Sequence, residues 1–118
     1  MVRATNAVAS HRRKKRLLKQ AKGFWGDRKN HLKMTKDAVM RALAFNYRHR
    51  KNKKRDFRRL WITRIGVATK IHGISYSKLV YGLKQAGCEL DRKMLADMAV
   101  RDPKSFAAVV GRAKQALA

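Results

Sequence analysis

The stretch DRKNHLKMTKDAVMRALAFNYRHRKNKKRDFRRLWITRI, residues 27–65, contains neither glycine nor proline. Residues of high helix propensity, chiefly Ala, Leu, Lys, Arg and Met, fill most of it. Gly66 stands alone within an apolar pattern that continues to Ile71, whereas Gly73 comes after that pattern has ended. We therefore predict one long helix of roughly 40–45 residues, with Asp27 as its N-cap and a break at His72-Gly73.

Only the C-terminal end of this helix has a regular apolar face. Apolar side chains recur there at steps of three and four residues: Phe57, Leu60, Trp61, Ile65, Ala68 and Ile71. Upstream, the apolar positions share no single stripe and cations occupy every side. A coiled coil would need a sustained heptad seam with paired charges of both signs, and that pattern is missing. The C-terminal end is thus expected to pack against the rest of the chain, and the upstream part against an external partner.

Three further helices are predicted by their capping signals. Ser75 or Ser77 caps the first, which ends before Gly87. Asp91 caps the second, and Asp102-Pro103 begins the third, because proline is favoured at the first helical position. Their expected core residues are Leu79, Val80, Leu83, Met94, Leu95, Met98, Val100, Phe106, Val109, Val110, Ala113 and Leu117. Residues 57–118 are therefore expected to form a small C-terminal helical domain.

The N-terminal part contains a second helical segment and an elbow. Residues 10–22 favour a short helix with Ser10 as N-cap and Gly23 as its stop. Phe24 and Trp25 then lie between two glycines, and either stack on an unpaired base or hold the two helices at an angle by apolar packing. The predicted fold is all-α: an extended basic N-terminal arm, residues 1–56 (tail, short helix and long helix), followed by the bundle of residues 57–118.

Charge is divided very unevenly between the two halves of the chain. The first 72 residues carry 23 Lys and Arg against three Asp, a net charge of +20 out of +24 for the whole chain. The remaining 46 residues carry eight basic and four acidic side chains, a net charge of +4. Such a density of like charge repels itself unless a polyanion neutralises it, which indicates nucleic acid or an anionic membrane as the partner.

Enzymatic chemistry has no signature in this sequence. The seven carboxylates are scattered, mostly at helix starts, and there is no histidine pair with a third ligand and no glycine-rich phosphate loop. The single cysteine excludes an internal disulfide and a thiolate zinc cluster. We therefore expect no catalytic residues, no metal, no cofactor and no small-molecule substrate. No apolar run approaches the roughly 18 residues of a membrane span, and no secretory signal is expected.

The basic run in residues 48–59 favours RNA among the polyanions. On a helix its cations form a cylinder of charge, whereas a duplex groove would need only one loaded face. Folded RNA presents phosphates from several directions, and arginine both contacts phosphate and stacks. A nucleoid-type DNA-binding protein is the alternative, but neither a dimer seam nor a wedge residue is evident. A membrane-active helix would need a continuous apolar face opposite the cations, which the arm lacks.

The candidate RNA-binding residues are the cations of the arm and of its junction with the bundle, together with the two elbow aromatics. They are Arg3, His11, Arg12, Arg13, Lys14, Lys15, Arg16, Lys19, Lys22, Phe24, Trp25, Arg28, Lys29, Arg48, His49, Arg50, Lys51, Lys53, Lys54, Arg55, Arg58, Arg59 and Arg64.

Residues 53–65, KKRDFRRLWITRI, closely resemble the signature of bacterial-type ribosomal large-subunit protein number twenty. The resemblance covers the whole chain. KGFWG at residues 22–26 is similar to the elbow of this family, and YS at 76–77, GLKQAG at 82–87 and LDRKMLAD at 90–97 are similar to its C-terminal domain. Two positions depart from the family pattern: Val2 replaces the usual proline, and Gly66 replaces the usual asparagine, so no base contact is assigned there.

The resemblance implies a structural protein that binds 23S rRNA and supports early assembly of the large subunit. It implies that the basic arm penetrates the rRNA and that the C-terminal domain lies at an rRNA junction beside neighbouring large-subunit ribosomal proteins. In some members that domain also represses translation of its own messenger RNA, which makes this mRNA a further candidate partner. The expected location is the cytoplasmic ribosome, with an organellar ribosome less favoured.

Overall fold

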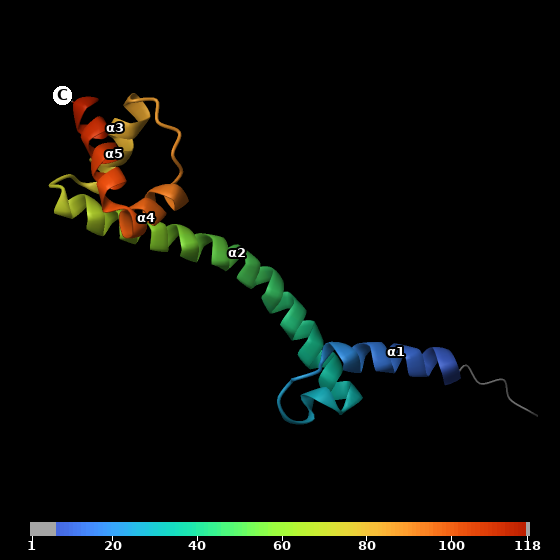
Figure 1. Cartoon of the computed structure of the whole chain (residues 1–118). Helices are drawn as coiled ribbons and strands as arrows, with labels where there is room; N and C mark the ends of the chain where they lie inside the picture. Colours follow the sequence, from blue (N-terminus) through green and yellow to red (C-terminus); the bar gives the residue numbers. More distant parts are fainter. Residues whose placement is uncertain (1–6, 118) are drawn as a thin grey trace, which may run out of the picture. The chain divides into compact units, whose positions relative to one another are not determined.

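The computed structural model describes residues 7–117, and every regular element in that range is helical (Figure 1). The predicted all-α class is therefore confirmed. In chain order the elements are α1 (Ala7–Gln20), the short 3-10 helix η1 (Gly26–Lys29), α2 (Leu32–Ile71), α3 (Tyr76–Gln85), α4 (Arg92–Arg101) and α5 (Pro103–Gln115).

The long helix is present, but it begins later than the sequence predicted. α2 has 40 residues, and Asp27 lies in η1 and is not its N-cap. The backbone at Gly26 is left-handed, with φ +60°, and the Asp27 carbonyl accepts hydrogen bonds from the amides of Asn30 and His31 at 3.2 and 3.0 Å. Propensity does not distinguish this tight turn from the first turn of an α-helix. The predicted break is confirmed: α2 ends at Ile71, and Gly73 is left-handed.

The first helix also differs from its prediction at its N-terminal side. α1 includes Ala7, Val8 and Ala9, so Ser10 lies inside the helix and is not its N-cap. Alanine favours helix strongly enough for the helix to continue upstream of the serine. At the other end, Gly23 has φ +85° and lies in the turn that ends the helix, as predicted.

All three predicted caps of the C-terminal helices are confirmed. The Ser75 hydroxyl accepts from the Lys78 amide at 3.3 Å, and the Asp91 carboxylate accepts from the Met94 amide at 2.8 Å. Asp102 accepts from the Ser105 amide at 3.1 Å, directly before Pro103 at the first turn of α5. These bonds satisfy helix N–H groups that lack an intrahelical partner.

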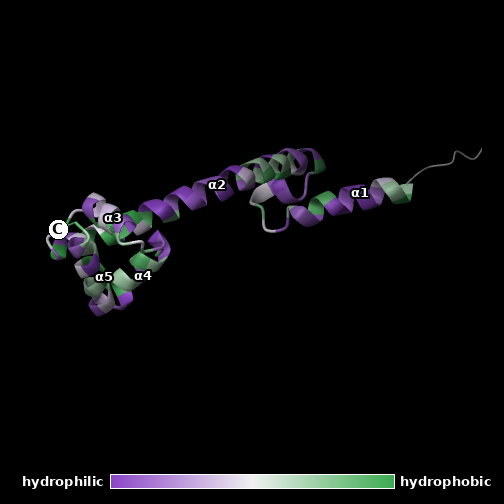
Figure 2. Ribbon diagram, turned by 90° about the horizontal axis from the view of Figure 1, so that it is seen from above, coloured by the Kyte–Doolittle hydropathy of each residue, from purple (hydrophilic) through white to green (hydrophobic). Residues whose placement is uncertain are grey.

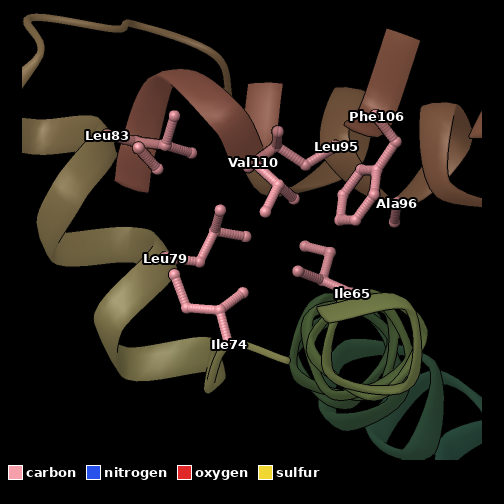
Figure 3. Packing of buried hydrophobic residues seen from close by; sticks show 9 residues of the cluster. Ile65, Ile74, Leu79, Leu83, Leu95, Ala96, Phe106 and Val110 are labelled. Carbon is pink, nitrogen blue, oxygen red and sulfur yellow. The ribbon is translucent and has the colours of Figure 1, made fainter. Parts of the chain in front are cut away.

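A small apolar core joins the end of α2 to α3, α4 and α5 (Figure 3). Ile65 is fully buried and projects from α2 toward Leu79 and Phe106, which are 0 % and 1 % exposed. The other members of the cluster are Ile74, Leu83, Leu95, Ala96, Val110 and Ala113. Hydrophobic residues gather in these helices, while hydrophilic ones dominate the middle of α2 (Figure 2).

Several side chains that the sequence assigned to the core are exposed instead. On α2 these are Phe57, Leu60 and Ile71, and in the other helices Met94, Val100 and Leu117. Helical spacing gives a broad apolar arc, but the three short helices cover only the part of α2 around Trp61, Ile65, Ala68 and Thr69. The predicted core was therefore too wide.

The chain divides into two compact units, and the division lies inside α2, between Lys51 and Asn52. In the first unit, the buried residues among those described are Ala21, Thr35 and Val39. The second unit contains the core around Ile65 and Phe106. The assignment of residues 1–56 as an RNA-penetrating arm and 57–118 as a globular domain stays a prediction.

Gly82 is required for the contact between α3 and α5. A Cβ atom at this position would lie 2.5 Å from the Ala113 carbonyl oxygen, which is backbone and cannot move alone. We expect Gly82→Ala to lower the free energy of unfolding by about 1–3 kcal/mol through overpacking. Gly111→Ala in α5 is the control, because its Cβ would meet nothing within 4 Å and should stabilise the helix by about 1 kcal/mol. Urea unfolding followed by tryptophan fluorescence measures both, and equal stability of the two variants would contradict the close approach.

Asp102 should make the C-terminal unit sensitive to acid. Hydrogen bonds from the Ser105 hydroxyl and amide hold the pKa of this carboxyl below its usual range. A carboxyl with a lowered folded-state pKa contributes stability above its unfolded pKa of about 3.9, and that contribution is lost as the pH falls through the folded value. Asp102→Asn keeps a good cap but does not titrate. We expect the difference in unfolding free energy between wild type and this variant to shrink below about pH 4 in urea titrations. A difference that stays constant with pH would contradict the coupling between protonation of Asp102 and stability.

Candidate nucleic-acid interface

The candidate cations are all exposed wherever the structure describes them. This holds for those of α1, of the elbow and of α2, while Arg3 lies outside the described residues. Within residues 7–117 the ion pairs join His31 to Asp27 at 3.7 Å and Arg101 to Asp97 at 3.0 Å. None of the described candidate cations takes part in either pair. Their charge is therefore uncompensated by the described part of the chain and available to phosphate.

Cations surround the helix at the start of the second unit. Successive residues of an α-helix advance by about 100°, so Lys53 and Arg64 lie on one side of α2. Lys54 and Arg58 lie about a third of a turn away, and Arg55 and Arg59 another third. All six side chains are exposed. The prediction that cations occupy every side of the helix is confirmed for this segment, and such a surface can contact phosphates from several directions at once.

Exposed aromatic rings on α2 lie next to other candidate cations, Arg48, His49 and Lys51. Sequence reasoning did not single out these rings. The Arg48 guanidinium carbon is 5.4 Å from the centroid of the Phe45 ring, and the His49 ring centroid is 5.6 Å from it. The Lys51 ammonium nitrogen is 4.5 Å from the centroid of the Tyr47 ring. The spacing of an aromatic residue and a base three or four positions later could have identified both sites. Each combines a stacking surface with a positive charge, as bound RNA requires.

The two elbow aromatics have different environments. Trp25 is 92 % exposed, so it does not serve as the apolar staple between helices that the sequence left open. Phe24 is half-buried and lines a cavity of about 490 Å³, here called the elbow cavity. The elbow and the first turns of α2 form its walls, and its lining includes Phe24, Trp25, Arg28, Asp37, Arg41 and Phe45. Stacking on RNA thus stays a prediction for both rings, and Phe24 also lines the cavity.

An apolar stripe crosses the exposed side of α2 in the second unit. Phe57, Leu60, Val67 and Ile71 are 44, 40, 60 and 79 % exposed, and their spacing places them on one side of the helix. Arg64 lies among them. Helical spacing predicted Phe57, Leu60 and Ile71 as core residues but did not indicate Val67. The described part of the chain leaves this apolar stripe uncovered.

Metal and membrane chemistry have no counterpart in the described residues. No group of three or more His, Cys, Asp or Glu side chains between residues 7 and 117 is placed to hold a metal ion. No helix in that range is both long and apolar enough to cross a membrane. The arrangement of exposed cations and rings suits binding of a polyanion that offers bases as well as phosphates.

Known proteins are similar in sequence to this chain over nearly its whole length. A family model described as Ribosomal protein L20 matches residues 3–109. The large ribosomal subunit protein bL20 of Protochlamydia amoebophila strain UWE25 is 75 % identical over 118 residues, all of both chains. The protein of the same name from Chlamydia trachomatis serovar L2 is 64 % identical over 117 residues, which are 99 % of this chain and 95 % of that one. That of Chlamydia muridarum is 63 % identical over 117 residues.

Binding to folded RNA should depend on every side of α2. We expect three double variants, each with both cations replaced by Gln, to weaken RNA binding alike and to reduce the log–log salt slope by about 2 each. The pairs are Lys53 with Arg64, Lys54 with Arg58, and Arg55 with Arg59. The measurement is the affinity for an rRNA fragment over a salt series. A loss confined to one pair would indicate a one-sided contact such as a duplex groove.

Proposed function

This chain belongs to the ribosomal protein L20 family, and from that membership we propose that it is a structural constituent of the large ribosomal subunit that binds rRNA. The family is structural and not catalytic, and the names of the relatives give no support to the nucleoid alternative. The observation that carries the proposal is the set of exposed cations on every side of α2 that form no ion pair within residues 7–117. They belong to a chain that matches the family from residue 3 to residue 109.

We propose further that the RNA is 23S rRNA and that the protein acts early in subunit assembly. Phosphates can reach all sides of a helix only when RNA closes around it. Such a helix must be in place before the surrounding RNA has folded completely, and this favours early binding. The candidate cations, Phe24 and Trp25 are proposed to make these contacts. The arm of residues 1–56 would be inserted into the RNA, and the bundle of residues 57–118 would lie at its surface.

Neighbouring large-subunit proteins are the proposed partners of the second unit. The apolar stripe formed by Phe57, Leu60, Val67 and Ile71 supports this, because exposed apolar side chains at such spacing suit a protein contact. The messenger RNA of the protein itself is a further proposed partner, since the same surface that binds an rRNA junction could bind a similar mRNA fold. The proposed location is the cytoplasmic ribosome.

Sedimentation and salt dependence test the proposed function together. In a high-salt cell lysate the native protein should migrate with large subunits through a sucrose gradient. Its affinity for an rRNA fragment should fall with a log–log salt slope of roughly −6 to −10, because it neutralises on the order of eight to twelve phosphates. Migration with the nucleoid would contradict the ribosomal role. A slope shallower than about −3 would mean that most of the cations stay solvated.

A further inference from the structure

The elbow cavity has the size and the chemistry of a ligand site. Its volume of about 490 Å³ lies within the range of about 300–1,000 Å³ that small-molecule sites occupy. All of its lining residues lie between 24 and 45, within the first compact unit, so no relation between the two units enters the argument. Two of the lining residues, Trp25 and Phe45, are exposed, so the cavity opens to solvent.

Aromatic side chains supply surfaces on which a base can stack. Trp25 is 92 % exposed and Phe45 is 49 % exposed, although both are large apolar rings at the edge of a cavity. Phe24, which is half-buried, forms part of the wall. Exposed aromatic rings beside cationic side chains are a common feature of sites that take splayed-out RNA bases.

Asp37 is the one carboxylate among the lining residues, and it lies in the most basic half of the chain. Within residues 7–117 it has no cationic partner within 4.0 Å, whereas Asp27 pairs with His31. A carboxylate repels phosphate, so the position of Asp37 in the cavity favours a ligand group that donates hydrogen bonds. An ionised carboxylate can only accept hydrogen bonds, through its two oxygens.

Guanine is the base whose edge matches this acceptor. Its N1–H and its N2 amino group are two adjacent donors on the Watson–Crick edge. In adenine and cytosine, one amino donor stands beside a ring nitrogen that accepts, and in uracil the single N3–H lies between two carbonyl oxygens. Only guanine can donate to both oxygens of one carboxylate from this edge.

Two guanidinium groups complete the site. Arg28 and Arg41 are exposed and belong to the same lining, one from η1 and one from α2. Arginine binds phosphate with two parallel hydrogen bonds. Arg28 and Arg41 are therefore suited to bind the phosphates on either side of an extruded nucleotide. The Asp37 carboxylate would then face the base of that nucleotide.

We propose that the elbow cavity binds one unpaired guanine of the RNA, with its base against the aromatic rings, its Watson–Crick edge donating to Asp37 and its flanking phosphates on Arg28 and Arg41. This rests on the proposed function, because the nucleotide is part of the bound RNA. It adds a base-specific contact to an interface that otherwise recognises phosphate.

The test uses the full-length protein and RNA hexamers that differ at one central position. The hexamers contain uridine throughout, or a single guanosine, adenosine or cytidine, so that all carry the same charge. The chain has two tryptophans, and the indole N–H signal of Trp25 in NMR spectra reports locally on the cavity, with Trp61 as the reference. At fixed salt we expect the guanosine hexamer to shift the Trp25 signal with an affinity at least about fivefold above that of the adenosine and cytidine hexamers.

Two substitutions with the same change of charge separate the base contact from general electrostatics. Asp37→Asn should reduce the preference for guanosine to about that for adenosine, because an amide no longer presents two acceptors. Asp56→Asn, outside the cavity, should leave the preference unchanged. Both variants raise the net charge equally, so any common gain in affinity cancels in the ratio.

Three outcomes would overturn the proposal: equal affinities for the guanosine, adenosine and cytidine hexamers, a guanosine preference that persists in Asp37→Asn, or a Trp25 signal that does not respond to any hexamer. In each case the protein could still sediment with large subunits and bind rRNA with a steep salt slope. Failure of the guanine site is therefore distinguishable from failure of the ribosomal role.

Discussion

Repulsion among the cations of α1 and α2 is the constraint on which the rest of the molecule depends. The first 72 residues carry 23 basic and three acidic residues, and among the described residues the candidate cations form no ion pair. Burial opposes this repulsion only weakly in the first unit, where Ala21, Thr35 and Val39 are the buried residues described. Phosphate is the natural compensation, and membership in a ribosomal protein family supplies a partner that carries it.

The second unit is stabilised by different means. Ile65 and Thr69, both fully buried, bring the end of α2 into the core that α3, α4 and α5 complete. The Thr69 hydroxyl donates to the Gly66 carbonyl at 2.9 Å, which satisfies its polar atom inside that core. The Lys114 ammonium group donates to the His72 carbonyl at 2.8 Å, where the negative end of the α2 dipole favours a cation. The last turn of the long helix is thus held by both apolar and polar contacts.

The elbow combines features that a purely electrostatic interface would not need. Cations alone would suffice to hold phosphates, yet the elbow cavity has exposed rings and a carboxylate, Asp37, that pairs with no cation among residues 7–117. A negative charge in this position weakens general attraction to RNA but suits a group that donates hydrogen bonds, such as the proposed guanine edge. Recognition of this kind requires a rigid wall, and the first turns of α2 provide it. In this proposal the same helix would bind phosphates along its middle and select a base at its beginning.

The sequence by itself determined the helical class, the end of α2 before Gly73, the three C-terminal caps and most core residues. The reason is that capping groups and apolar spacing act within a few positions along the chain. It also determined the basic character that indicates RNA. Tertiary structure decided the rest. Whether Phe57 and Ile71 are buried depends on how far three short helices reach along α2, and the start of α2 depends on a tight turn at Gly26. The elbow cavity joins Trp25 to Asp37 and Phe45, and such a grouping exists only once the backbone has turned at the elbow, since no local pattern specifies it.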